Sequence, residues 1–141
     1  MFGIKVQYLS NKIKKDTIIT KKRGMVMLFL CYKRCSTCQK AKKWLDVHQK
    51  EYQERAIVEE APTYEELKEW YQKSGLPLKK FFNTSGKLYK ENHLKDKLGT
   101  MSEEEQLQLL ASNGMLVKRP IVVQGDLVLV GFHETDWNEK L

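Results

Sequence analysis

Hydrophobic residues in the first half of the chain form the pattern of a strand, a helix and a second strand. Residues 26–32 are an unbroken apolar run, which is typical of a strand buried on both faces. A helical pattern follows to about Gln49. Its apolar positions are Ala41, Trp44, Leu45 and His48. Residues 52–58 then read as a second strand, so we expect a right-handed βαβ unit with parallel strands.

The middle of the chain is predicted to be a helical insertion, at about residues 62–113. Two capping boxes open helices there, Thr63-x-x-Glu66 and Ser102-x-x-Glu105. Gly75 and the Asn-Gly pair at 113–114 are expected to end these helices. Residues 78–82 can form a short helix between them.

The last part of the chain returns to strands. Residues 121–123 and 127–130 are apolar and flank Gln-Gly-Asp, which indicates a hairpin. Residues 134–141 can form a final helix. Without the insertion, the order βαβ followed by ββα is that of a thioredoxin-like domain. We therefore expect an α/β fold with a mixed four-stranded sheet of this kind, interrupted by the helical insertion.

The net charge of +7 lies almost entirely in the first 24 residues. That segment has seven Lys and Arg residues and one acid, a net of +6, which leaves +1 for the other 117 residues. We expect residues 1–24 to be a disordered or mis-assigned extension, and residues 25–141 to form a single domain. The alternative for the extension is a basic tail that binds an acidic partner. A nearly neutral body gives no evidence for direct nucleic-acid binding.

Composition also restricts where the protein works. No apolar run approaches the roughly 18 residues of a membrane span, so we expect no membrane contact. Three cysteines do not make a secreted disulfide scaffold. We therefore expect a cytoplasmic protein.

Cys35 and Cys38 form a Cys-x-x-Cys motif where the first strand passes into the helix. Free backbone N–H groups and the helix dipole favour a thiolate at this position. Lys33 and Arg34 add positive charge nearby. Cys38 lies one helical turn further on, within reach of an adduct on Cys35. The pattern predicts that Cys35 is the nucleophile and Cys38 the resolving thiol.

Two other interpretations of the motif exist. Cys-x-x-Cys is also half of a zinc site, but Cys31 and the three histidines offer no paired second half. The cysteines could instead be small core residues, but the polar neighbours Ser36 and Thr37 argue against this and are expected to support the site. We expect Cys31 to be a buried hydrophobic residue. No catalytic role is assigned to His48, His93 or His133, and no metal or bound cofactor is expected.

Arg119-Pro120 is the second candidate feature. Proline can occupy the first position of a strand, and in thioredoxin-like folds a cis-proline at this place faces the redox cysteine. Arg119 would then bring a fixed charge next to the thiolate and could hold an oxyanion. The alternative is an ordinary trans proline beside a surface arginine.

Four segments of the chain resemble the arsenate reductase / Spx family: residues 32–46, 62–67, 79–86 and 116–123. The resemblance covers about residues 25–137 and implies a thioredoxin-like fold with a helical insertion. In the arsenate reductase branch, Cys35 matches the nucleophile and Arg119 matches one of three arginines that bind the oxyanion. The other two arginines have no match, because Asn83 and Gly131-Phe132 lie near their places.

The two branches of this family imply different functions. The reductase branch implies a thiol–disulfide oxidoreductase that acts on arsenate, a related oxyanion or a disulfide. Its electron donor would be thioredoxin, glutaredoxin or a small thiol. The Spx branch carries Cys-x-x-Cys as a redox switch and implies a transcriptional regulator that binds the C-terminal domain of the RNA polymerase α subunit. The oxidoreductase is the leading hypothesis and the regulator is the alternative.

Overall fold

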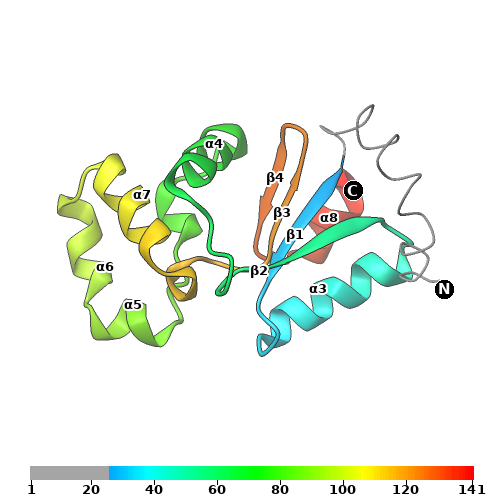
Figure 1. The fold of residues 1–141 in the computed structure, drawn as a ribbon, viewed down its shortest axis with the longest axis horizontal. Coiled ribbons are helices and arrows are strands. Elements are labelled where there is room, and N and C mark those ends of the chain that lie inside the picture. The colour runs from blue at the N-terminus through cyan, green and yellow to red at the C-terminus, as the bar shows by residue number, and fades with distance from the viewer. Residues whose placement is uncertain (1–25) are drawn as a thin grey trace.

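The computed structural model describes residues 26–141, which form a four-stranded sheet with helices on both faces (Figure 1). The extension expected at residues 1–24 lies outside the described residues. The strands are β1 (Met27–Cys31), β2 (Tyr52–Ala56), β3 (Ile121–Gln124) and β4 (Leu127–Val130). Their order is β2-β1-β3-β4, with β1 and β2 parallel and the other two pairs antiparallel. This confirms the predicted thioredoxin-like mixed sheet.

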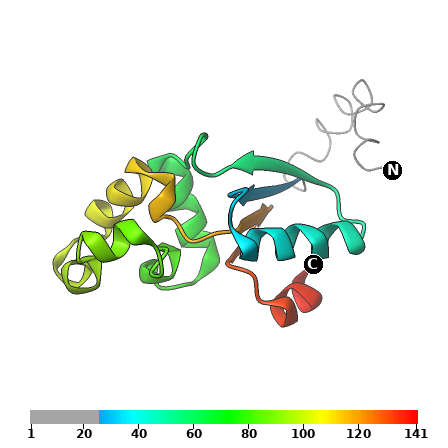
Figure 2. The same cartoon turned by 90° about the horizontal axis from the view of Figure 1, so that it is seen from below.

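Two helices cover one face of the sheet, as Figure 2 shows. They are α3 (Ser36–Val47) and α8 (Glu134–Lys140). On this side Phe29, Val122 and Leu129 from the sheet pack with Trp44 and Trp137 from the helices. Successive strand residues point to opposite faces. The other face is therefore available to the insertion.

The helical insertion occupies the chain between β2 and β3. It consists of α4 (Tyr64–Ser74), η2 (Leu78–Phe81), α5 (Lys87–Glu91), α6 (Leu94–Lys97), η3 (Leu98–Thr100), α7 (Glu103–Ser112) and η4 (Gly114–Leu116). Leu30, Ile121 and Val128 from the sheet share one buried cluster with insertion residues such as Leu67 and Leu110. Both faces of the central strands are thus covered, which explains the unbroken apolar run at β1. Among residues 26–141, no helix is long and apolar enough to cross a bilayer.

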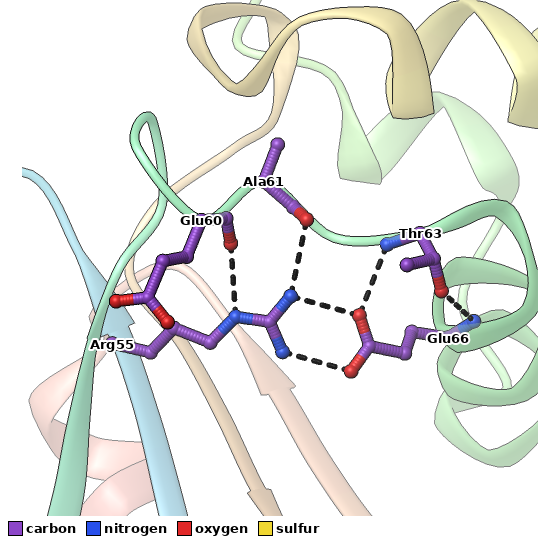
Figure 3. Close-up of polar contacts among 5 residues, drawn as sticks. All are labelled: Arg55, Glu60, Ala61, Thr63 and Glu66. Carbon is purple, nitrogen blue, oxygen red and sulfur yellow. Dashed lines mark hydrogen bonds and ion pairs between the residues drawn. The ribbon is translucent and has the colours of Figure 1, made fainter.

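A polar network joins the end of β2 to the start of α4 (Figure 3). The guanidinium of Arg55 donates to both carboxylate oxygens of Glu66, at 2.8 and 2.9 Å. It also donates to the backbone carbonyls of Glu60 and Ala61, at 2.9 and 3.1 Å. Glu66 accepts in addition from the N–H of Thr63, which completes the predicted capping box. The network therefore fixes the direction in which the insertion leaves the sheet.

The insertion is also attached to the chain just before β3. Phe82 and Val117 form an isolated antiparallel bridge. Two backbone hydrogen bonds of 2.7 and 2.8 Å between residues 81–83 and 116–118 flank that bridge. The segment that leads into Arg119 is held by the insertion as well as by the sheet.

Candidate functional site

Cys35 occupies the N-cap of α3, as the sequence predicted. Its backbone N–H donates to the carbonyl of Tyr32 at 3.0 Å, and its carbonyl accepts from Gln39 at 3.1 Å. The first bond closes the turn after β1, and the second begins the helix. The half-buried thiol of Cys35 therefore lies among the free N–H groups of the first helical turn.

Cys38 lies close to Cys35 but is buried, with 2% of its surface exposed. Its sulfur accepts a hydrogen bond from the backbone N–H of Tyr32 at 3.3 Å. Burial raises the pKa of Cys38 to about 12, and the neighbouring Cys35 adds to this, against the opposing effect of the Tyr32 N–H. Cys38 is thus held as a thiol at neutral pH.

The pKa of Cys35 is shifted in the opposite direction to that of Cys38. Burial would raise its pKa, but hydrogen bonds from the backbone N–H and the thiol of Cys38, together with the charge and hydrogen bond of Arg119, lower the pKa below its ordinary value. Lys33 and Arg34, expected from the sequence to supply the positive charge, are exposed. The cation among the main causes of the lowered pKa is Arg119, 84 residues further along the chain, and the contribution of Lys33 and Arg34 stays a prediction.

Arg119 is held in place from several sides. Its guanidinium lies 4.9 Å from the centre of the Tyr32 ring, and its Nη1 lies 3.5 Å from the carbonyl of Met115. Within residues 26–141, its buried Nε has no hydrogen-bond partner. The Arg119–Pro120 bond is cis, as expected. Arg119 is therefore oriented by packing and retains unused donor capacity.

Cys35 and Arg119 open onto a cleft of about 430 Å³. It is lined by Cys35, Thr37, Asn83, Ser85, Gly86, Lys118, Arg119, Phe132 and His133. Thr37 thus lies at the cleft, whereas the exposed Ser36 and the buried Pro120 are not among its lining residues. Pro120 instead accepts a backbone hydrogen bond of 2.7 Å from Gly131. Its position is behind the cleft wall.

Six cleft residues were not predicted as site residues: Asn83, Ser85, Gly86, Lys118, Phe132 and His133. Lys118 directly precedes the Arg-Pro pair, and this was the one local signal that could have identified it. His133, to which the sequence analysis assigned no catalytic role, is exposed, follows β4 and lines the cleft. Gly131 supports this arrangement, since a Cβ there would lie 3.3 Å from the Lys118 side chain.

The remaining cysteine and histidines lie elsewhere. Cys31 is buried, and its thiol donates to Glu54 at 3.2 Å. Burial, followed by that hydrogen bond, raises its pKa to about 12. His48 is exposed and stacks on Trp44, so it does not belong to the apolar face of α3 as expected. In the described part of the chain, no group of three or more His, Cys, Asp or Glu side chains could hold a metal ion.

The fold and the motif define a thioredoxin-like protein with a Cys-x-x-Cys pair at the start of α3. The ArsC family model matches residues 30–140, and the chain belongs to the ArsC family. Among solved structures, it is similar to an ArsC family related protein from Bacteroides fragilis, with 60% identity and a TM-score of 0.80 over 82% of this chain and 98% of that one. A "possible arsenate reductase" from Streptococcus mutans is 40% identical, with a TM-score of 0.75 over 81% and 98% of the two chains.

Curated relatives include both uncharacterised and regulatory proteins. YusI of Bacillus subtilis, an uncharacterised protein, is 57% identical over 82% of this chain and 98% of its own. The regulatory protein MgsR of Bacillus subtilis is 32% identical over 76% of this chain and 83% of its own. The global transcriptional regulator Spx 2 of Bacillus cereus is 29% identical over 72% of this chain and 76% of its own. Family membership is therefore compatible with both functions derived from the sequence.

Proposed function

We propose that this protein is a thiol–disulfide oxidoreductase of the ArsC family. The observation that carries the proposal is the opposite shift of two adjacent thiols. The pKa of Cys35 is lowered at the mouth of a cleft, while burial raises the pKa of Cys38 to about 12 directly behind it. A thiolate is the attacking form of cysteine, so Cys35 is primed to attack and Cys38 waits as a thiol.

With a disulfide substrate, the Cys35 thiolate attacks one sulfur, forming a mixed disulfide and releasing the other sulfur as a thiolate. Cys38 then attacks Cys35 and forms the Cys35–Cys38 disulfide. Its proton leaves with the second substrate sulfur. The substrate gains two electrons and one proton from the protein, because Cys35 starts as a thiolate and Cys38 as a thiol, and the first substrate sulfur leaves as a thiolate.

An oxyanion such as arsenate is the other substrate that the cleft supports. Arg119 and Lys118 place two cations beside Cys35, and Asn83 and Ser85 add polar side chains. Reduction of arsenate to arsenite by the dithiol releases one oxygen as water and leaves the Cys35–Cys38 disulfide. Arg119 matches one of the three arginines that bind the oxyanion in the reductase branch, and the other two have no match in this chain. We therefore expect arsenate to bind weakly and disulfide exchange to be faster.

A catalytic cycle of this kind needs a cellular dithiol or small thiol, such as thioredoxin or glutaredoxin, to reduce the Cys35–Cys38 disulfide. All three cysteines are free in the structure. A site that starts from the dithiol suits a reducing compartment, and we therefore propose the cytoplasm. Ser36, Thr37 and Pro120 are proposed to support the cysteine pair and not to react.

Selective alkylation tests this function. We expect iodoacetamide at pH 6.5 to modify Cys35 much faster than Cys31 or Cys38, as read by peptide mass spectrometry. Mild peroxide should then produce a Cys35–Cys38 disulfide in the parent chain and not in Cys38→Ser. Equal alkylation of Cys35 and Cys38 would contradict the assigned roles. Turnover of arsenate and of a model disulfide, measured with a thiol donor, identifies the preferred substrate.

The second candidate is a redox-dependent regulator that binds the C-terminal domain of the RNA polymerase α subunit. Its support is the similarity to MgsR and Spx 2. A pull-down of that domain by the oxidised and reduced protein separates the two functions. If the polymerase domain is retained in only one redox state and no substrate is turned over, the regulator is the correct function and the oxidoreductase is not.

A further inference from the structure

A groove of about 440 Å³ follows the outer edge of β4, next to the Cys35 cleft. Lys118 and His133 line both hollows, so the two are adjacent. Val128 and Val130 line the groove from the insertion face of the sheet, and Leu129 lines it from the α8 face. Because residues from both faces contribute, the groove follows the strand edge itself.

The backbone of β4 has unused hydrogen-bonding groups on this side. The N–H of Gly131 donates to the carbonyl of Pro120, which sets the alternation of bonds along the β3–β4 ladder. Leu129 therefore bonds to β3, while Val128 and Val130 direct their N–H and C=O groups away from it. Within residues 26–141, no strand pairs with this edge. An extended peptide can add here as a further strand.

The groove is strongly basic. Its charged lining consists of Lys79, Lys80, Lys118 and Lys140 against the single acid Asp136, with His133 in addition. In the described chain, none of these four lysines is in an ion pair. The body of the protein is otherwise nearly neutral, so the positive charge is concentrated beside the redox site. Such a concentration attracts acidic groups and steers their approach.

We propose that this groove binds an extended acidic segment of a dithiol protein that exchanges disulfides with Cys35. The proposal rests on the proposed function and deepens it, because it names the chemical character of the partner. Two other occupants are disfavoured by charge. Residues 1–24 carry a net charge of +6, and a second copy of this chain would present the same lysines.

The geometry relates the acidic segment to the redox step. With both thiols free, Cys38 is buried and Cys35 is half-buried, so we expect Cys35 to be the accessible sulfur of the oxidised pair. A partner thiolate enters through the cleft and attacks Cys35, so Cys38 leaves and takes up a proton. The second partner thiol then attacks the mixed disulfide and releases the Cys35 thiolate. The partner dithiol becomes a disulfide, while its acidic segment lies along β4.

Fluorescence anisotropy with synthetic peptides tests the groove. The probe is a labelled eight-residue peptide of alternating Glu and Val, compared with a Gln-and-Val peptide of the same length. We expect the acidic peptide to bind and the neutral one not to. The triple variant Lys79→Glu, Lys80→Glu, Lys140→Glu should weaken binding at least about tenfold, as loss of several charge contacts implies. Binding should also weaken with added salt.

The matched control reverses three exposed lysines outside the groove, as Lys43→Glu, Lys90→Glu, Lys97→Glu. It has the same net charge as the triple groove variant and should bind the acidic peptide like the parent chain. Equal loss in both variants would show that only net charge matters and would overturn the proposal. Tighter binding of a single-stranded DNA octamer, or of a peptide copy of residues 1–24, than of the acidic peptide would also overturn it. A dimer of the parent chain that dissociates in the groove variant would do the same.

A parallel measurement separates the groove from the redox chemistry. Exchange of Cys35 with the neutral 2-hydroxyethyl disulfide should proceed at the same rate in the parent chain and the groove variant. Normal exchange without peptide binding would overturn the groove and leave the proposed function standing. Peptide binding without any exchange would have the opposite meaning, because the acidic-segment site would stand and the oxidoreductase would not.

Discussion

Two cysteines three positions apart acquire different chemistry from their immediate surroundings. Cys35 has access to the cleft and to the guanidinium of Arg119, and its pKa falls although burial opposes this. Cys38 is enclosed by the sheet and α3, and burial raises its pKa to about 12. The difference arises from the burial of Cys38, from the hydrogen bonds that Cys38 gives to Cys35, and from the cation of Arg119, which a distant part of the chain supplies.

Replacement of Arg119 tests that dependence. In Arg119→Ala the pKa of Cys35 should rise, because a hydrogen bond and a favourable charge are lost. At pH 6.5 the thiolate fraction then falls, and alkylation should slow several-fold. Arg119→Lys should restore the charge effect better than oxyanion binding, because lysine lacks the planar fork. Thiolate absorbance near 240 nm, followed against pH, measures the shift.

Arg34→Ala is the matched control for Arg119→Ala. Arg34 is adjacent to Cys35 in the sequence but is exposed. We expect its replacement to leave the Cys35 titration unchanged. If Arg34→Ala shifted the titration as much as Arg119→Ala, the local charges and not Arg119 would activate the thiol.

At the scale of elements, the insertion is held by polar contacts at one end and by backbone pairing at the other. The Arg55–Glu66 network fixes α4 where the chain leaves β2 (Figure 3). The Phe82–Val117 bridge holds the insertion where the chain returns. A bidentate, partly buried arginine–carboxylate pair is worth more than an ordinary surface ion pair.

Glu66→Gln tests the first of these attachments. The amide oxygen of the substituted side chain would still accept from the N–H of Thr63, so the loss should report mainly the charged bond to Arg55. We expect the free energy of unfolding to fall by about 1 kcal/mol at pH 7. The exposed pair Lys87–Glu91 is the control, and Glu91→Gln should cost about 0.5 kcal/mol or less. Urea denaturation measures both.

The cost of Glu66→Gln should depend on pH. Arg55 is the main cause that lowers the pKa of Glu66 in the folded protein. A carboxyl group whose pKa is lowered by folding stabilises the fold at pH values above its pKa in the unfolded chain. This stabilisation is lost as the pH falls through its pKa in the folded protein. The parent chain and Glu66→Gln should therefore converge in stability below about pH 4. A constant difference down to pH 3 would contradict the ionic origin.

At the scale of the whole molecule, the insertion and the sheet meet at a point with no free space. A Cβ at Gly114 would lie 2.0 Å from the backbone oxygen of Ile57, just after β2. That contact is between backbones, so no side-chain rotation can relieve it. The two parts of the molecule approach each other closely because position 114 has no side chain.

Gly114→Ala should therefore destabilise the protein by about 2 kcal/mol or more, as forced overpacking does. Gly99→Ala is the control, because a Cβ there meets nothing within 4 Å. We expect it to be neutral or slightly stabilising. Thermal unfolding measures both. Similar melting temperatures for the two variants would show that the junction can relax.

Local signals predicted some of this architecture and tertiary contacts determined the rest. The capping residues Thr63 and Ser102 start α4 and α7, because a cap acts within one turn. Helices α5 and α6 have no side-chain cap at Gly86 or His93, so no local pattern marked them. The position of Cys35 followed from a strand–helix junction. The cleft that Asn83, Ser85 and Gly86 form with Lys118 could not be predicted from local signals. These residues lie more than 30 positions before Lys118 and meet it only because the insertion folds back and pairs Phe82 with Val117.

The bridge between residues 81–83 and 116–118 has a consequence for hydrogen exchange. The amides of Asn83 and Lys118 are the donors of its two flanking bonds. If the insertion opens locally, both amides lose their acceptors in the same event, and Lys118 and Arg119 lose the segment that holds them beside Cys35. These amides should exchange at one common rate, slower than the exposed N-terminal turn of α5. The same opening rate would limit how often the site loses its cations.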